Sequence, residues 1–194
     1  KTIDNDLALT DHTPGYGSAA KYIGTSMKEI IRDGISMIQP KGNVTIVEIM
    51  GRNAGWLTGA TALSKGEDCD GPDLIYLPEV PFDIQKFGER VRDLLKNRTF
   101  VCVAVSEGIR DKDGKYICDY GDSVDFVDAF GHKQLSGTAT FLAGYIKGEI
   151  GCKTRAIELS SMQRSASHLA SRIDILEATQ VGGAAVKAAD EGDT

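Results

Sequence analysis

The two apolar stretches 44-VTIVEIM-50 and 100-FVCVAV-105 decide the fold of this chain of 194 residues. Both are rich in β-branched residues and are continuous rather than alternating, which is typical of parallel strands that are covered on both faces. Two shorter strands are expected at 74–77 and 154–159. Parallel strands require crossover connections, which are usually helices, so helical periodicity is expected in the segments between them.

The longest helical pattern precedes the first strand. Between residues 17 and 38 apolar residues recur at helical spacing, with charged residues on the opposite side, and Pro40 and Gly42 follow as stop signals. This pattern predicts an amphipathic helix. Its core-facing residues are expected to be Tyr22 or Ile23, Met27, Ile30, Ile31, Ile35 and Ile38.

The remaining helices are expected between and after the strands. Asp83 is placed to cap one of them, and Trp56 is expected in the core. Strands that alternate with helices predict right-handed βαβ crossovers, and therefore an α/β fold with a parallel sheet and helices on both faces. These further helices are expected at residues 56–62, 84–96, 136–146, 166–178 and 181–189.

The opening segment, 1-KTIDNDLALTDHTPGYGSAA-20, contains a Gly-x-Gly-x-x-Ala run from Gly15. Such a run suggests a dinucleotide-binding loop, but that loop needs a buried strand directly upstream, and the residues before Gly15 are polar. We therefore favour a simple helix start, with Thr13 as the N-cap and Pro14 in the first turn.

The overall composition limits the classes of partner. Hydrophobic residues make up 41% of the chain, which is enough for a core, and the net charge is −6. An acidic protein is a poor sequence-independent nucleic-acid binder, because phosphate contacts need a clustered basic surface. No apolar run approaches the ~20 residues that cross a bilayer, and no signal segment opens the chain. We expect a cytoplasmic protein that binds neither nucleic acid nor membranes.

The cysteines and histidines show no metal-binding pattern. Four cysteines are scattered without a Cys-x-x-Cys pair, so neither a zinc site nor a disulfide framework is indicated, and the three histidines share no ligand spacing. Asp122, Asp125 and Asp128 are expected to form a solvated face, with a cation site as the alternative.

Parallel α/β sheets bind ligands beyond the carboxyl ends of their strands, and this rule selects candidate site residues. Arg52 follows the first long strand, Glu107 follows the second, and Arg164 comes shortly after the last. Guanidinium groups pair with phosphate oxygens, and a carboxylate accepts hydrogen bonds from hydroxyls. Two arginines and a carboxylate at one rim therefore indicate a phosphorylated sugar.

Four motifs, in order along the chain, carry a family resemblance. They are 1-KTIDND-6, 50-MGR-52, 106-SEG-108, and Arg155 followed by 163-QR-164. In this order and spacing they resemble the motifs of the phosphofructokinase family, over essentially the whole chain. The resemblance implies a phosphofructokinase-like fold, of which this chain holds the second, sugar-binding domain and parts of the first.

The resemblance implies that Asp4 is the general base. A carboxylate within hydrogen-bond reach of the 1-hydroxyl of fructose 6-phosphate can take its proton as the phosphoryl group arrives. Thr2 resembles the family's hydroxyl near that phosphoryl group, with a role in loop rigidity as the alternative. Arg52 would hold the sugar or stabilise charge on the phosphoryl group. For Asp4 and Arg52 the alternatives are a turn carboxylate and a surface ion pair.

The remaining motif residues resemble those that bind the sugar phosphate. Met50 and Gly51 would let the sugar approach the backbone, and Glu107 would accept hydrogen bonds from its hydroxyls. Arg155 and Arg164 resemble the two arginines for the 6-phosphate, one of which is typically donated across a subunit interface. The resemblance therefore implies a homodimer or homotetramer with shared sugar-phosphate sites.

Lys1 bears on the phosphoryl donor. Pyrophosphate-dependent members resemble this chain in having a lysine before T-I-D-N-D, and an ammonium there can neutralise a phosphate of pyrophosphate. Some ATP-dependent members of the same branch also carry this lysine, so pyrophosphate is favoured and ATP is the alternative. The implied cofactor is Mg²⁺. Asp6 either influences that metal or orients the loop, and the main metal ligand is expected upstream of Lys1.

The glycine-rich donor loops of the family lie upstream of T-I-D-N-D, and this chain contains no counterpart of them. We therefore expect a truncated or cleaved polypeptide with little or no kinase activity alone. Residues 14–161 are expected to form the fructose 6-phosphate-binding domain, and residues 1–13 and 162–194 to be remnants of the donor domain. A non-catalytic sugar-phosphate-binding regulatory subunit is the alternative, against which the retained base and sugar-binding residues argue.

Overall fold

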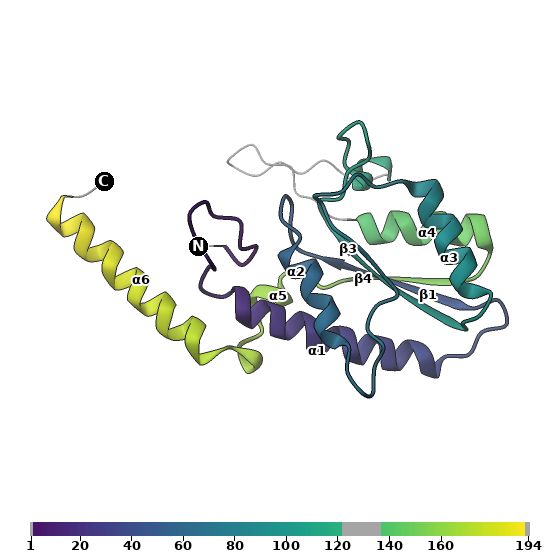
Figure 1. The fold of residues 1–194 in the computed structure, drawn as a ribbon, viewed down its shortest axis with the longest axis horizontal. Helices are drawn as coiled ribbons and strands as arrows, with labels where there is room; N and C mark the ends of the chain where they lie inside the picture. Colours follow the sequence, from purple (N-terminus) through teal and green to yellow (C-terminus); the bar gives the residue numbers. More distant parts are fainter. Residues whose placement is uncertain (1, 122–136, 193–194) are drawn as a thin grey trace.

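The computed structural model describes residues 2–121 and 137–192, and these form an α/β fold around a parallel sheet (Figure 1). The sheet has the order β2-β3-β1-β4, and each of its strand pairs is parallel. The predicted α/β class and parallel sheet are confirmed. The strands are β1 Asn43–Ile49, β2 Leu74–Tyr76, β3 Phe100–Ser106 and β4 Lys153–Glu158.

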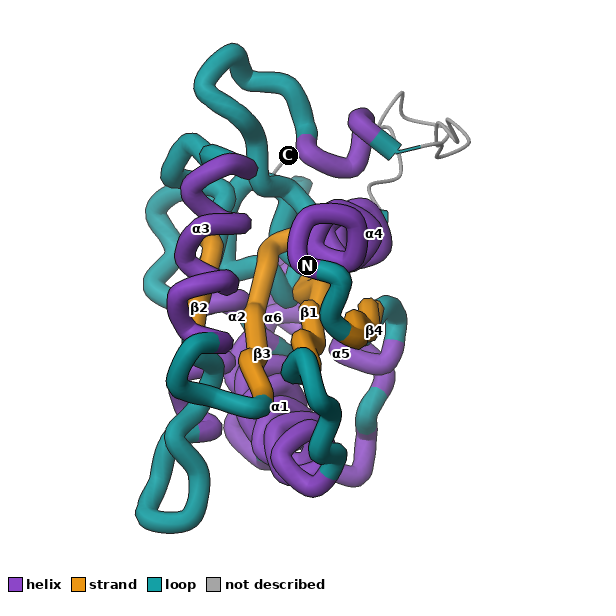
Figure 2. The backbone as a smooth tube through the Cα atoms, turned by 90° about the vertical axis from the view of Figure 1, so that its right-hand side faces the viewer, coloured by secondary structure: helices purple, strands orange, loops and turns teal. Residues whose placement is uncertain are grey.

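Helices cover both faces of the sheet, as predicted. Figures 1 and 2 show α1 on one side of the strands and α3 and α4 on the other. Asp83 caps α3 as expected, because its carboxylate accepts hydrogen bonds from the amides of Gln85 and Lys86. The α-helices are α1 Tyr16–Ser36, α2 Trp56–Gly59, α3 Ile84–Leu95, α4 Thr138–Ile150, α5 Met162–Ser165 and α6 Arg172–Glu191. Short 3-10 helices are Ala60–Ser64, Ile117–Tyr120 and Ser167–Leu169.

The two long strands lie in the middle of the sheet and are buried along their whole length. In β1, Val44 and Ile46 pack towards α3 and α4, whereas Val47 and Ile49 pack towards α1. Each large apolar side chain buried in this way contributes about 1.5–3 kcal/mol. Double coverage therefore explains why these strands have continuous rather than alternating apolar sequences, while the edge strand β4 alternates between exposed and partly buried residues.

The last turn of α1 differs from the prediction. Ile35 in this turn and Ile38, two residues after the helix ends, were both expected in the core but are 58% and 79% exposed. The buried residue of this turn is Gly34, where an added Cβ would lie 2.1 Å from the ring of Phe100. The helix therefore approaches β3 too closely for a side chain, and a glycine occupies the position that hydrophobic periodicity assigns to an isoleucine.

Two other expectations were wrong. Trp56, expected in the core, begins the short helix α2 and is 57% exposed. The two helices expected at 166–178 and 181–189 are replaced by α5, a 3-10 turn and the single helix α6, because no proline interrupts residues 172–191 and the backbone ladder continues. Figure 1 shows α6 projecting from the body of the sheet.

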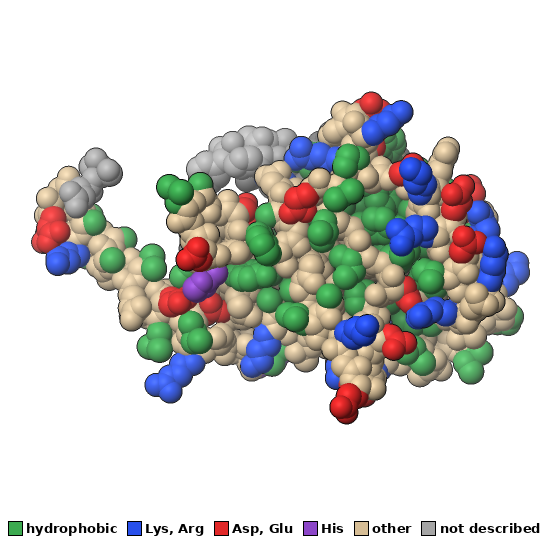
Figure 3. All heavy atoms as spheres, in the orientation of Figure 1, with side chains coloured by type: hydrophobic (Ala, Val, Ile, Leu, Met, Phe, Trp, Pro, Cys, Tyr) green, Lys and Arg blue, Asp and Glu red, His purple; other side chains and the backbone are tan. Residues whose placement is uncertain are grey.

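The surface is mixed in charge. On the face seen in Figure 3, acidic and basic side chains alternate over the sheet body rather than forming a field of one sign. Among the helices of residues 2–121 and 137–192, none combines the length and the apolar character that a membrane span needs.

Candidate active site

The N-terminal loop, residues 2–13, is held in place by its own side chains. The amide of Asp4 donates to Oγ1 of Thr2 over 3.0 Å, and the amide of Thr13 donates to Oδ1 of Asn5 over 2.9 Å. The hydroxyl of Thr13, which is 1% exposed, donates to the carbonyl of Thr2 over 2.5 Å. Thr13 therefore closes the loop and does not cap α1 with its side chain, contrary to the prediction.

The helix α1 is capped instead by a residue from α6. Its N-cap position is Gly15, which has a φ of 105° and no side chain to offer. The carboxylate of Asp174 accepts hydrogen bonds from the amide and the hydroxyl of Ser18, over 2.6 and 2.5 Å. The hydroxyl of Ser18 also accepts a bond from the amide of Ser171 over 2.8 Å. These bonds fasten the first turn of α6 to the first turn of α1.

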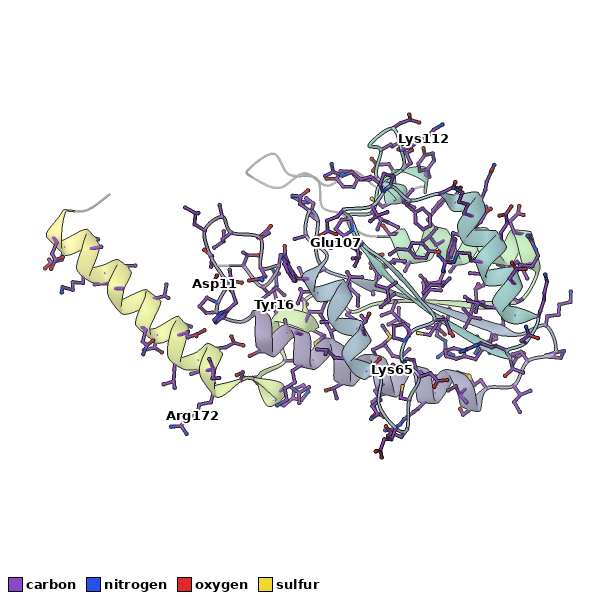
Figure 4. All side chains as sticks on the ribbon, in the orientation of Figure 1. Asp11, Tyr16, Lys65, Glu107, Lys112 and Arg172 are labelled. Carbon is purple, nitrogen blue, oxygen red and sulfur yellow. The ribbon has the colours of Figure 1, made fainter. Side chains whose placement is uncertain are left out.

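The carboxyl ends of β1 and β3 are joined by hydrogen bonds at and near Gly51. Oε1 of Glu107 accepts from the amide of Gly51 over 3.3 Å, and the hydroxyl of Ser106 donates to the carbonyl of Gly51. The amide of Glu107 in turn donates to the carbonyl of Ile49 over 2.9 Å. Figure 4 shows Glu107 at the end of the sheet that faces the N-terminal loop.

Two glycines permit this close approach. Gly51 has a φ of 136°, and a Cβ there would lie 2.5 Å from the carbonyl oxygen of Ala54. A Cβ on Gly108 would lie 1.9 Å from the carbonyl oxygen of Arg52. Gly108 of the S-E-G motif is therefore required by the contact between the two strand ends, and Gly51 of the M-G-R motif by the turn of its own segment, whatever ligand the rim binds.

Asp4, Arg52 and Glu107 form one electrostatic group. Burial raises the pKa of Asp4, the nearby Asp6 raises it further, and Arg52 opposes both effects. Burial raises the pKa of Glu107 to about 7, the hydrogen bond from Gly51 opposes this, and Asp4 adds to it. The loop and the rim therefore bring two carboxylates with raised pKa values to one arginine.

One member of this group, Asp4, lines a cavity of about 730 Å³. Its walls come from the N-terminal loop, the end of β1, the turn after β4, and α6. Gln163 stands between two of these elements, because its Oε1 accepts from the amide of Met50 and its Nε2 donates to the carbonyl of Ser160, each over 3.1 Å. The residues that line the cavity include Thr2, Asp4, Met50, Gln163, Arg164 and Asp174.

The structure thus brings most of the predicted site residues to one end of the sheet, but not Arg155. Arg155 is paired with Thr45, three residues before the end of β4, which corresponds to about 10 Å along the strand. Its guanidinium lies 3.3 Å from the carboxylate of Asp33 in α1. Lys1 lies outside the described residues. The residues brought together are Thr2, Asp4, Met50, Gly51, Arg52, Glu107 and Arg164.

The described residues supply at most part of a metal site. Asp6 is exposed beside Asp4, and no group of three histidine, cysteine or acidic residues within 2–121 and 137–192 is arranged to hold a metal ion. Mg²⁺ commonly takes one or two protein carboxylates and completes its shell with water and substrate phosphates. Asp6 fits that limited role. Asp122, Asp125 and Asp128 lie outside the described residues.

Two residues that build the site were not identified as candidates from the sequence. Asp174 is 156 positions from Ser18, and no local pattern links them. Glu48 is 5% exposed, and its Oε2 accepts from the amide of Ala139 at the start of α4 over 2.8 Å. Burial raises the pKa of Glu48 to about 7, against the effect of that bond. A charged residue inside the apolar run VTIVEIM was the available signal.

Known proteins resemble this chain in sequence and in fold. A family model described as phosphofructokinase matches residues 1–189. A pyrophosphate–fructose 6-phosphate 1-phosphotransferase of Xanthomonas campestris is 45% identical over 192 residues, which are 99% of this chain and 45% of that protein. A protein of the same name from Halomonas elongata is 43% identical over 192 residues, with the same two coverages.

The fold comparison agrees. The crystal structure of a pyrophosphate-dependent phosphofructokinase from Marinobacter aquaeolei matches with a TM-score of 0.78 and 36% identity, over 100% of this chain and 44% of that one. The chain thus spans slightly less than half the length of these relatives. Because the family model covers nearly all of its residues, the chain belongs to the phosphofructokinase family.

Proposed function

We propose that the protein containing this chain transfers a phosphoryl group from pyrophosphate to the 1-hydroxyl of fructose 6-phosphate, giving fructose 1,6-bisphosphate in glycolysis. The observation that carries the proposal is the grouping of Asp4, Arg52 and Glu107 beside one cavity. The names of the similar proteins from Xanthomonas campestris and Halomonas elongata support the same reaction.

Asp4 is the proposed general base. A carboxylate whose pKa is raised by burial is a stronger base than an ordinary aspartate once it is ionised, and it can take the proton of the attacking hydroxyl. Arg52 lies close enough to influence the pKa of Asp4, so its fixed positive charge can act on the sugar or on the oxygens of the transferring phosphoryl group. Thr2 sets the loop by accepting the amide hydrogen of Asp4.

Glu107, Met50, Gly51 and Arg164 are the proposed sugar-phosphate residues. Glu107 uses Oε1 to fix the amide of Gly51, which leaves Oε2 for a sugar hydroxyl. Arg164 is exposed at the cavity, where its guanidinium can pair with a phosphate. Since burial raises the pKa of Glu107 to about 7, we expect sugar binding to weaken as the pH falls below 7 and this acceptor is protonated.

Arg155 is proposed to serve the site of a neighbouring subunit. Within one chain its guanidinium is directed to Asp33 and away from the rim that carries Arg164. This separation supports a homodimer or homotetramer in which each 6-phosphate is held by arginines of two subunits. Arg155 is exposed, as a residue that reaches a partner must be.

The donor side of the reaction is proposed to lie mainly outside this chain. Mg²⁺ would accompany the donor phosphates and neutralise part of their charge, with Asp6 as the residue of this chain that would influence it and the main ligand upstream of Lys1. Lys1 would contact pyrophosphate. Residues 14–161 are proposed as the sugar-binding domain, and residues 1–13 and 162–194 as parts of the donor domain of a cytoplasmic enzyme. The 194-residue chain alone is expected to be nearly inactive.

The test is an assay of the intact natural protein with fructose 6-phosphate, Mg²⁺, and either pyrophosphate or ATP. We expect turnover with pyrophosphate, and we expect Asp4→Asn to reduce kcat by about 100-fold or more. Asp11→Asn, an exposed aspartate of the same loop, is the matched control and should stay near the wild-type rate.

Each other outcome has a distinct meaning. Turnover with ATP alone would keep the fold and the base but overturn the choice of donor. No turnover with either donor would overturn the enzymatic proposal in favour of a sugar-phosphate-binding regulatory subunit. An Asp4→Asn variant within a few-fold of the wild type would remove the role of Asp4.

A further inference from the structure

Gln163 is buried in an otherwise exposed turn. It is 3% exposed, whereas each of the other residues from 160 to 170 is exposed or partly exposed. Both ends of its side-chain amide are used, since Oε1 accepts from the amide of Met50 and Nε2 donates to the carbonyl of Ser160. The orientation of the amide follows from these partners, because one can only donate and the other can only accept.

The side chain of Gln163 takes the place of a backbone hydrogen-bond acceptor beyond the end of β4. The last backbone bond between the two strands runs from the amide of Leu159 to the carbonyl of Glu48 over 3.3 Å. Ser160 then has a φ of 46°, which turns the chain away from β1. The next β1 group on this edge is the amide of Met50, and the Gln163 side chain supplies the acceptor that a further β4 residue would have supplied.

We propose that Gln163 is a positioning residue that sets the separation between Arg164 and the Met50-Gly51 backbone, and thereby the fit of the sugar phosphate. The proposal rests on the proposed function of this site. Gly51 is fixed to Glu107 on its β3 side, and Gln163 fixes Met50 on the β4 side. Arg164 follows Gln163 directly, so a displacement of Gln163 moves the phosphate-binding guanidinium relative to the sugar-binding backbone.

The position demands a group that donates and accepts at once. A glutamate in its ionised form would still accept from Met50 but would direct a second oxygen at the carbonyl of Ser160 without a hydrogen between them. A protonated glutamic acid would restore the donor. In the variant Gln163→Glu, lowering the pH should therefore re-form both hydrogen bonds without any other change in sequence.

The experiment measures kcat and KM for fructose 6-phosphate in the intact enzyme between pH 6 and pH 8.5, for the wild type, Gln163→Glu and Gln180→Glu. At the highest pH we expect Gln163→Glu to raise KM about tenfold with kcat within about threefold, since a buried group is left unsatisfied. The ratio of its KM to that of the wild type should fall towards one as the pH is lowered. Glu107, whose pKa burial raises to about 7, is present in all three proteins, as are the cavity-lining carboxylates Asp4 and Asp174, so their titration affects both KM values of the ratio.

Gln180→Glu adds the same charge to an exposed position of α6 and should leave KM unchanged at every pH. A KM ratio for Gln163→Glu that stays near one at pH 8.5, in a folded variant, overturns the positioning role. A raised ratio that does not change with pH also overturns it, because that result indicates general damage. If the wild type itself neither turns over nor binds fructose 6-phosphate, the proposed function fails instead.

A readout that needs no substrate keeps the proposal testable in that case. Hydrogen exchange at the amide of Met50 should be slow in the wild type and much faster in Gln163→Met, which preserves the apolar volume but removes the acceptor. Unchanged exchange in Gln163→Met would show that Gln163 does not hold the end of β1.

Discussion

Two groups of polar residues around the sheet lie in opposite circumstances. At the carboxyl end Glu48, Ser106 and Gln163 are buried, and each is bonded to a backbone group of a different segment. Nearer the amino end, Arg155 and Asp33 form a pair whose side chains are 45% and 61% exposed. The contrast teaches that polar residues fix geometry where water is excluded, because unmade bonds are costly there, whereas exposed pairs exchange readily with solvent.

The strongest way to break this contrast is to force the two strand ends apart. In Gly108→Ala the added Cβ would lie 1.9 Å from the carbonyl oxygen of Arg52, so the backbone must move. We expect the free energy of unfolding to fall by about 3 kcal/mol or more, and sugar-phosphate binding to be lost. Urea unfolding and a binding titration on the intact protein would measure both.

The matched control is Gly148→Ala in α4, where an added Cβ meets no atom within 4 Å. Alanine is favoured over glycine in a helix by up to about 1 kcal/mol, so this variant should be as stable as the wild type or more stable. If both glycine variants behaved alike, the contact between the strand ends would not be the cause.

A smaller effect should follow from the buried carboxylate of Glu48. Burial raises its pKa from 4.5 to about 7, so the folded state holds a proton that the unfolded state releases between these values. The associated stability is present below pH 4.5 and is lost as the pH rises through 7. Relative to Glu48→Gln, which cannot ionise, the wild type should lose about 2 kcal/mol between pH 5 and pH 8, as measured by urea unfolding at each pH.

Glu158→Gln is the control for that measurement, because Glu158 is exposed and is paired with Glu48 on the neighbouring strand. It should reproduce most of the pH dependence of the wild type. Glu107 is unchanged in both variants, so its own titration does not distinguish them. If the free energy of unfolding varied with pH in the same way in the wild type and in Glu48→Gln, the explanation by the buried carboxylate would be contradicted.

The smallest change in stability is expected from removing the exposed ion pair between Arg155 and Asp33. Arg155→Ala removes an exposed ion pair with Asp33, and such pairs contribute about 0–1 kcal/mol. We expect the unfolding midpoint in urea to stay nearly constant, while KM for fructose 6-phosphate rises in the intact protein, as the proposed role of Arg155 at a neighbouring subunit requires. A loss of stability as large as that of Gly108→Ala would mean that the amino end of the sheet is as constrained as the rim.

The sequence was informative where a residue's role depends on its neighbours in the chain. The continuous apolar runs predicted β1 and β3, and the rule for strand ends then selected Arg52, Glu107 and Arg164. It was not informative where the role depends on a distant partner. Gly34 faces Phe100 and Asp174 caps α1, and neither contact has a local signature.

The position of β4 in the sheet has a consequence for synthesis. Asn43 at the start of β1 pairs with Lys153 of β4, so the edge strand leaves the ribosome about 110 residues after its partner, an interval of roughly 5–20 s. During this interval an apolar nascent strand presents an open edge to any other unpaired strand. Slower elongation lengthens the interval, so the yield of correctly folded protein should depend on the translation rate of the host.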